Sequence, residues 1–172
     1  MRLWRKFYSV TQNYFELFNL PEKFQIDSVK LQENYRSIQK EIHPDRFATS
    51  TENEKVQSMI KSTQVNDAYQ TLKSPTKRAK YILSLHKSVE KITLPPDFLM
   101  QQMEWEEHLE DIEKNNKELD QFKLAINKKY EEYSLMLSTQ IDNDQNWNEA
   151  AITIDKLYFV EKLLHKINIS LN

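Results

Sequence analysis

Three consecutive residues, His43, Pro44 and Asp45, could carry chemistry because an imidazole and a carboxylate stand two positions apart. Histidine exchanges a proton near neutral pH, and a carboxylate is a common companion in acid–base catalysis. Pro44 fixes its own φ, lacks a backbone donor and disfavours a helical conformation at His43, so a helix must end there. The tripeptide is therefore either a functional site within a loop or a purely structural turn between two helices.

The segment before this loop has the periodicity of an amphipathic helix that Asp27 can cap. Its apolar positions alternate in spacing between four and three residues: Leu31, Tyr35, Ile38 and Ile42. Its other face carries Arg36 and Lys40, one turn apart. We expect this helix to bury one face and to present basic side chains on the other.

A second amphipathic helix follows the loop, and Thr51 with Glu54 has the spacing of a capping box at its start. Its predicted packing positions are Val56, Met59, Ile60, Thr63, Val65, Ala68, Tyr69 and Leu72. We expect it to pair antiparallel with the preceding helix. Ser74 followed by Pro75 then opens a further helix that ends near His86. One side of that helix carries Ala79, Ile82 and Leu83.

The stretch SVEKITLPP, residues 88–96, breaks the helical periodicity and ends in two prolines, which predicts a linker. Three more helices are predicted beyond it, at about 97–115, 117–141 and 146–169. Their predicted buried stripes include Phe98, Trp105, Leu109 and Ile112, then Phe122, Ile126, Tyr130, Tyr133 and Leu137, then Trp147, Ala150, Ile154, Leu157 and Leu164. Short loops between amphipathic helices favour an antiparallel bundle. The sequence predicts an all-α protein with an N-terminal extension (1–12), a helical domain (13–87), the linker (88–96) and a C-terminal three-helix bundle (97–172).

Composition excludes several classes of function. With 24 basic and 26 acidic residues the net charge is −2, so no overall charge favours nucleic acid. The chain lacks cysteine for a disulfide, a thiolate nucleophile or a zinc–thiolate site, and lacks glycine for a phosphate-cradling loop. The segment 142–153 begins like a calcium loop but has neither its glycine nor its final glutamate. We therefore expect no metal and no cofactor. In addition, no apolar run in the sequence approaches the roughly 18 residues that a membrane span needs.

The surroundings of the tripeptide resemble a known family. A basic-faced helix, a His-Pro-Asp loop and an antiparallel helix, in YRSIQKEIHPDRF and NDAYQTLKSPTKRAKYILSL, are similar to the J-domain, the module through which co-chaperones engage DnaK-class heat-shock ATPases. NYFELFNLP before it and FLMQQMEWEEHLEDIE after the linker look like the HscB co-chaperones of iron–sulfur cluster assembly. The resemblance covers almost everything from Asn13 onward, and it implies that residues 13–87 are a J-domain.

The resemblance implies a chaperone-binding site at the loop. Its residues would be Arg36, Lys40, His43, Pro44, Asp45 and Arg46. The three cations would steer the encounter with an acidic chaperone surface, a contribution that salt weakens. His43 and Asp45 would make directional polar contacts, and Pro44 would limit the entropy lost on binding.

A second candidate site lies on the first helix of the bundle. On a helical wheel Leu99, Met100 and Met103 fall opposite the predicted buried stripe, among acidic residues. Exposed apolar groups rimmed by charge often mark a partner site, and methionine suits an adaptable one. Phe159 similarly falls off the stripe of the last helix. The resemblance implies that an IscU-type iron–sulfur scaffold binds at Leu99, Met100, Met103, Glu104, Glu107, Asp111 and Phe159; a two-sided bundle core is the alternative.

The resemblance thus implies a non-enzymatic adaptor that stimulates a DnaK-class (HscA-like) chaperone and delivers the scaffold to it. Two alternatives stay open: a hydrolase that uses His43 and Asp45, and a general J-domain folding co-chaperone. We expect neither nucleic acid nor a membrane as a partner. The bacterial character of the resemblance favours the cytoplasm, whereas the basic and apolar start MRLWRKFYSVTQ, typical of a targeting segment, keeps the mitochondrial matrix as an alternative.

Overall fold

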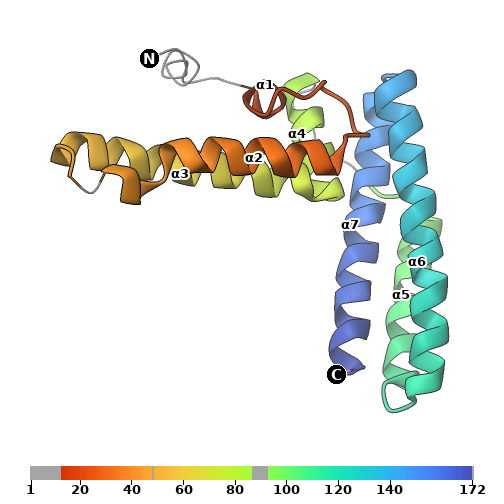
Figure 1. The fold of residues 1–172 in the computed structure, drawn as a ribbon. Coiled ribbons are helices and arrows are strands. Elements are labelled where there is room, and N and C mark those ends of the chain that lie inside the picture. The colour runs from red at the N-terminus through yellow and green to blue at the C-terminus, as the bar shows by residue number, and fades with distance from the viewer. Residues whose placement is uncertain (1–12, 48, 87–92, 172) are drawn as a thin grey trace. The chain divides into compact units, whose positions relative to one another are not determined.

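The computed structural model describes residues 13–47, 49–86 and 93–171, and within these ranges the regular elements are all helical (Figure 1). The longer helices are α2 (Ser28–Ile42), α3 (Glu52–Lys73), α4 (Pro75–His86), α5 (Pro96–Ile112), α6 (Asn116–Ser138) and α7 (Trp147–Ser170). The shorter elements are α1 (Tyr14–Leu17), a 3₁₀ turn (Pro44–Phe47) and a π-helical turn (Thr139–Asn143). The predicted all-α fold class is confirmed. None of the described helices has the length and apolarity needed to cross a membrane.

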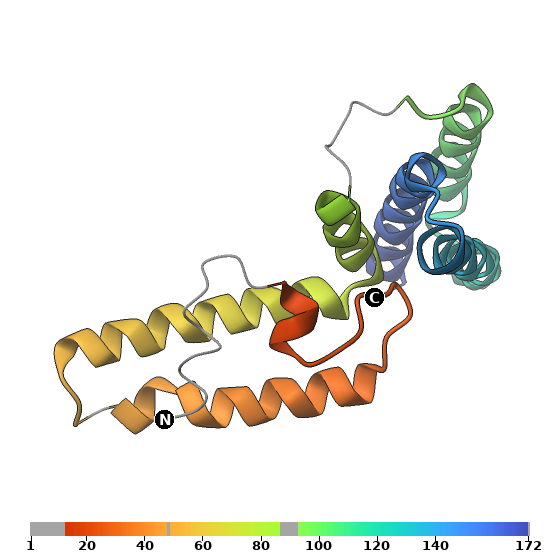
Figure 2. The ribbon, with the colours of Figure 1, turned by 90° about the horizontal axis from the view of Figure 1, so that it is seen from above.

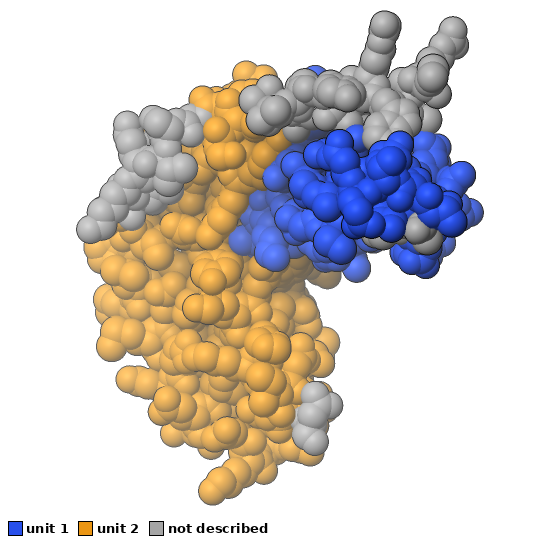
Figure 3. Space-filling view, turned by 90° about the vertical axis from the view of Figure 1, so that its left-hand side faces the viewer, with its two compact units in different colours: residues 1–78 blue, residues 79–172 orange. Residues whose placement is uncertain are grey.

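The chain divides into two compact units between Arg78 and Ala79, inside α4 (Figure 3). This division places the first turn of α4 in one unit and the rest of α4 in the other. The predicted J-domain extends further, to residue 87. Most of the predicted linker and the whole predicted extension, residues 88–92 and 1–12, lie outside the described residues. The predicted domain limits therefore stay a prediction.

The centre of the first unit is an antiparallel pair of helices, α2 and α3 (Figure 2). The Asp27 carboxylate accepts hydrogen bonds from the first backbone donors of α2, and Thr51 with Glu54 forms the expected capping box of α3. The Tyr35 ring of α2 stacks on the Tyr69 ring of α3, with centroids 4.0 Å apart. The core of this unit consists of Phe15, Phe18, Leu20, Phe24, Leu31, Ile42, Val65, Ala68, Tyr69 and Leu72.

The first half of α3 differs from the prediction. Val56, Met59 and Ile60 were expected to pack, but all three are exposed. The residue that faces α2 there is Ser58, which is buried and stands seven positions, two helical turns, before the buried Val65. The prediction was wrong because it followed the apolar residues, whereas the packing face of α3 continues through a small polar one.

The second unit is built around α5, α6 and α7, which form the predicted three-helix bundle. Asn115 and Asn146 cap α6 and α7 through their side-chain oxygens, at the two short connections. The buried side chains include Phe98, Leu109 and Ile112 of α5, then Leu119, Phe122, Ile126, Tyr133 and Leu137 of α6, then Ala150, Ile154, Leu157, Val160, Leu163 and Ile167 of α7. Most of the predicted stripes are thus buried, while Trp105, Tyr130, Trp147 and Leu164 are half-buried.

Candidate functional site

The helix α2 ends at the tripeptide, as its proline requires. Ile42 is the last residue of α2, and His43 already has extended backbone angles, φ −58° and ψ 131°. The chain then enters the 3₁₀ turn that begins at Pro44, and the Arg46 backbone N–H donates to the His43 carbonyl over 3.0 Å. The loop is therefore a turn that a backbone hydrogen bond closes.

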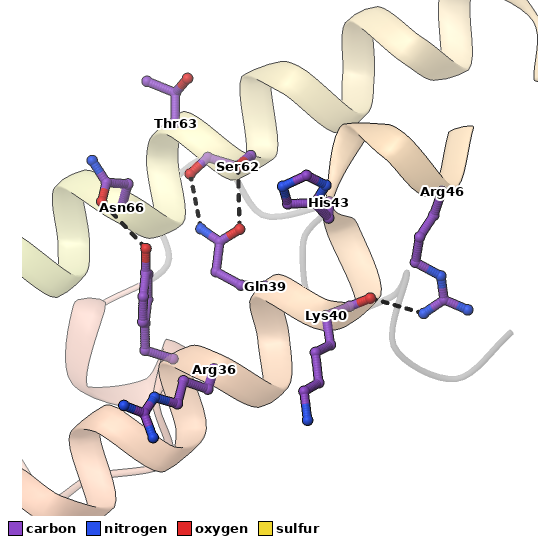
Figure 4. A pocket seen from close by; sticks show the side chains of 9 residues that line it. Arg36, Gln39, Lys40, His43, Arg46, Ser62, Thr63 and Asn66 are labelled. Atoms are coloured by element: carbon purple, nitrogen blue, oxygen red, sulfur yellow. Dashed lines mark hydrogen bonds between the residues drawn. The ribbon is translucent and has the colours of Figure 1, made fainter. Parts of the chain in front are cut away.

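Two side chains hold the end of α2 by binding carbonyls that have no partner within the helix. The Ser58 hydroxyl, buried on α3, donates to the Ile42 carbonyl over 2.6 Å. The Arg46 guanidinium donates to the Lys40 carbonyl over 2.9 Å (Figure 4). One bond comes from α3 and the other from the loop itself, and both hold the loop to the end of α2.

The imidazole of His43 is oriented by the chain itself. Its Nδ1 accepts a hydrogen bond from the Asp45 backbone N–H over 3.3 Å, so in the neutral ring the proton is on Nε2. The nearest Asp45 carboxylate oxygen lies 3.6 Å from the same Nδ1. The two side chains remain 54% and 90% exposed, respectively. An Nε2 donor and a carboxylate acceptor are thereby exposed to solvent.

A hollow of about 790 Å³ lies along α2 and α3 next to this loop. It is lined by Tyr35, Arg36, Gln39, Lys40, His43, Arg46, Ser62, Thr63 and Asn66. Figure 4 shows Gln39 of α2 and Ser62 of α3 joined by two hydrogen bonds, of 3.3 and 3.5 Å, across it. We call this surface the basic groove.

Four of the six predicted chaperone-binding residues meet in the basic groove: Arg36, Lys40, His43 and Arg46. Asp45 lies next to its edge, two residues beyond His43. Three cations on one face give a locally positive surface on a chain whose net charge is −2. The arrangement suits an acidic partner surface. Nothing in the sequence of α3 marked Ser62 or Asn66 as residues that line the basic groove.

The geometry does not resemble that of a hydrolytic site. In a catalytic triad the acid orients the imidazole by accepting from its Nδ1–H, whereas here Nδ1 accepts from a backbone N–H. Both side chains are largely exposed to solvent. Among the described residues there is also no group of three or more acidic or histidine side chains that could hold a metal ion.

The second candidate site is on α5. Leu99, Met100 and Met103 are all exposed there, as their helical phase predicts. Glu104, Glu107 and Asp111 are exposed on the same helix. We call these six residues the α5 patch. Large apolar side chains in water beside carboxylates do not contribute to the bundle core, so the alternative of a two-sided core at these three apolar positions is wrong.

Phe159 differs from the other predicted members of this site. It is half-buried, its ring stacks on Trp105 with centroids 6.2 Å apart, and it meets Phe98 edge-on at 6.0 Å. The expectation that it lies off the packed face of α7 was wrong, because α7 contacts both α5 and α6 and buries more than one stripe. Phe159 therefore helps to hold α7 against α5.

Comparison with known proteins matches both parts of the chain. The DnaJ domain family model matches residues 13–81, and the model described as the HSCB C-terminal oligomerisation domain matches residues 94–168. A co-chaperone protein HscB homolog from Photobacterium profundum is 40% identical over 162 residues, which are 90% of this chain and 94% of that one.

Solved structures agree with this assignment. The chaperone HscB from Vibrio cholerae matches with a TM-score of 0.85 at 38% identity, over 91% of this chain and 96% of that chain. The human co-chaperone protein HscB matches with a TM-score of 0.87 at 30% identity, over 94% of this chain and 83% of that chain. Together with the His43–Asp45 loop, these matches show that the chain belongs to the HscB family of J-domain co-chaperones, which serve iron–sulfur cluster assembly with an Hsp70-type chaperone.

Proposed function

We propose that this protein stimulates the ATPase of a DnaK-class (HscA-like) chaperone through the basic groove and brings an IscU-type scaffold to it through the α5 patch. The observation that carries the first half is the meeting of Arg36, Lys40, His43 and Arg46 in one groove beside an anchored loop. A co-chaperone needs no reactive group of its own, because it acts by binding one conformation of the ATPase better than another.

The anchoring of the loop suits this role. A loop that is already ordered loses little conformational entropy when it binds, so more of the contact energy is expressed as affinity. The cations of the basic groove raise the rate of encounter with an acidic surface. His43 and Asp45 make directional hydrogen bonds that fix the orientation of the bound partner. The basic groove thus combines a long-range attraction with a short-range geometric requirement.

The α5 patch supports the second half of the proposal. Exposed methionines adapt to a partner's shape, while the surrounding carboxylates select a partner with basic residues. One chain that binds both partners raises the concentration of the scaffold near the chaperone. The proposed site includes Phe159 as a supporting residue, since its ring packs on Trp105 of the helix that carries the patch.

The test is a chaperone ATPase assay with the full chain, in the presence and absence of the scaffold. We expect stimulation by the chain alone and further stimulation when the scaffold is added. A general J-domain folding co-chaperone would stimulate the ATPase without a response to the scaffold. A hydrolase would show turnover with no chaperone present. Either of these results would overturn the proposal.

The proposed location is the bacterial cytoplasm, by similarity to bacterial relatives such as that of Photobacterium profundum. The mitochondrial matrix remains the alternative, and the basic N-terminal residues that suggest it lie outside the described ranges. Mass spectrometry of the native protein distinguishes the two locations. An N-terminus just before Asn13, on protein isolated from an organelle, would contradict the bacterial location.

A further inference from the structure

Three apolar residues in the first half of α3 are exposed and contribute nothing to the core of the J-domain. Val56 is 53% exposed, Met59 is 64% exposed and Ile60 is 45% exposed. Spacings of three and four residues place them next to one another on one side of the helix. We call these three residues the α3 patch. Single exposed apolar residues are ordinary, but adjacent ones often mark a contact surface for a partner.

The α3 patch continues the wall that α3 contributes to the basic groove. One row of residues runs along this side of α3 at spacings of three, four and three: Val56, Met59, Thr63 and Asn66. Thr63 and Asn66 line the basic groove. The Thr63 hydroxyl donates to the Met59 carbonyl, one turn before it, over 3.1 Å. The same side of α3 is therefore polar along the groove and apolar beyond it.

The α3 patch lies toward the end of the basic groove that holds His43. The hydrogen bond from Ser58 to the Ile42 carbonyl sets the residue before His43 against the turn of α3 that carries Met59. Figure 4 shows the His43 ring next to Ser62, which stands three residues after Met59. A partner that covers the groove as far as His43 is thereby brought to the edge of the α3 patch.

The charges around the α3 patch indicate what kind of surface it fits. Glu52 and Lys55, which stand within about one turn of Val56, pair with each other, and the Lys55 Nζ lies 2.8 Å from a Glu52 carboxylate oxygen. The residues that α3 contributes to the basic groove are polar and uncharged: Ser62, Thr63 and Asn66. The cations of the groove come from α2 and the loop. A complementary partner is therefore acidic opposite α2 and apolar opposite the α3 patch.

We propose that the α3 patch is a second contact surface for the DnaK-class chaperone and binds an apolar surface that borders the acidic surface facing the basic groove. This inference rests on the proposed function, because the groove identifies the partner and the α3 patch extends the contact with it. Burial of apolar groups adds affinity that salt does not screen, whereas the cations mainly set the encounter rate. The α3 patch thus strengthens binding, while the His43–Asp45 loop stimulates the ATPase.

The test is a titration of the HscA-like chaperone with the full chain, followed by ATPase rate at low and at high salt. The double variant Val56→Gln with Met59→Gln removes apolar surface and keeps α3 helical, because glutamine is a good helix former. The half-saturating concentration should rise about tenfold, which corresponds to roughly 1.4 kcal/mol, and the maximal stimulation should stay unchanged. The rise should be the same at both salt concentrations. Val29→Gln, at a residue of α2 that is 63% exposed, is the matched control and should change neither quantity.

Calorimetry identifies the physical cause of the lost affinity. Binding of the unaltered chain to the chaperone, measured at several temperatures, should show a negative heat-capacity change. The change should be less negative for the double variant, because less apolar surface is buried on binding. Urea midpoints should be equal, since both substituted side chains are exposed in the free chain.

The outcomes separate this inference from the proposed function. An unaltered chain that does not stimulate the ATPase would overturn both. If the chain stimulates and Asp45→Asn does not, yet the double variant keeps its half-saturating concentration, only the inference about the α3 patch is wrong. In that case, a smaller sedimentation coefficient of the double variant alone would assign the α3 patch to a second copy. Loss of its ability to suppress aggregation of reduced α-lactalbumin would assign the patch to an unfolded client.

Discussion

The hydroxyl of Ser58 donates a 2.6 Å hydrogen bond to the carbonyl of Ile42, and this bond joins α3 to the last residue of α2. The hydroxyl is buried, so water cannot take its place as donor. The next residue along the chain is His43. A small polar side chain in the first half of α3 thus anchors the start of the His43–Asp45 loop, at the point where Pro44 ends α2.

The first prediction concerns this bond. Ser58→Ala leaves a buried carbonyl without its donor, which should cost about 1–3 kcal/mol of unfolding free energy, and it should also reduce chaperone stimulation because the loop loses an anchor. Urea denaturation and the ATPase assay measure the two effects. Ser84→Ala is the matched control, since it removes an exposed serine–carbonyl bond of 2.7 Å and should change neither quantity appreciably. Unchanged stimulation by Ser58→Ala would show that the anchor is dispensable.

A second prediction separates contact with the chaperone from structure. Asp45→Asn should abolish stimulation of the chaperone ATPase while thermal unfolding stays nearly unchanged, because the carboxylate is 90% exposed. His43→Gln should behave in the same way. Asp67→Asn makes the same chemical change at another exposed position of the J-domain and should retain full stimulation. Unfolding of either loop variant would mean that the loop serves the fold instead of a partner.

The third prediction is electrostatic. Arg36→Glu should weaken stimulation at low salt and make the remaining activity less sensitive to salt, because it removes one of the three cations of the basic groove. Lys30→Glu carries the same charge change on α2, outside the lining of the basic groove, and should have a smaller effect. ATPase stimulation measured across a salt series gives both slopes. Equal slopes for the two variants would argue against a specific role for the basic groove.

The fourth prediction separates the α5 patch from Phe159. Alanine at Leu99, Met100 and Met103 together should weaken scaffold binding by more than about 1 kcal/mol, yet cost little stability because the side chains are already in water. Phe159→Ala should instead cost about 2–3 kcal/mol of unfolding free energy, because its ring packs against both Phe98 and Trp105.

Titration calorimetry with the scaffold and urea denaturation distinguish these effects. Ile169→Ala, an exposed apolar residue near the end of α7, is the control and should change neither affinity nor stability. Intact scaffold affinity in the triple variant would show that the α5 patch is not the binding site.

The fifth prediction follows from the capping box of α3. The Thr51 hydroxyl and backbone N–H both donate to Glu54 and lower the pKa of its carboxyl group below the usual 4.5. A lowered pKa in the folded state means that the stabilisation is present above the unfolded-state pKa and is lost as the pH falls through the folded value. Glu54→Gln should therefore be less stable than the unaltered chain at pH 7, with the difference shrinking below about pH 4.5. Urea midpoints at several pH values provide the measurement, and a difference that grows at low pH would contradict it.

Local features were predictable from the sequence because they depend on neighbouring residues alone. The end of α2 before Pro44 and the caps at Asp27 and Thr51 all lie where the sequence places them. The exposure of Leu99, Met100 and Met103 also followed from their phase on one helix. Arg36, Lys40 and His43 were assigned to one site by resemblance, and all three line the basic groove.

Other features depend on which residues of another helix lie opposite, and a single helix pattern does not contain that information. The packing face of α3 passes through Ser58 instead of Val56 or Met59, because the end of α2 offers a carbonyl that needs a donor. Phe159 is half-buried because α7 meets α5 as well as α6. The sequence alone therefore determined the helices, their ends and the His43–Asp45 loop through short-range sterics and hydrogen bonding. Only the tertiary structure decided which side chains anchor that loop. The Ile42 carbonyl at the end of α2 needs a hydrogen-bond donor, and the residue that donates to it depends on how α3 packs against α2.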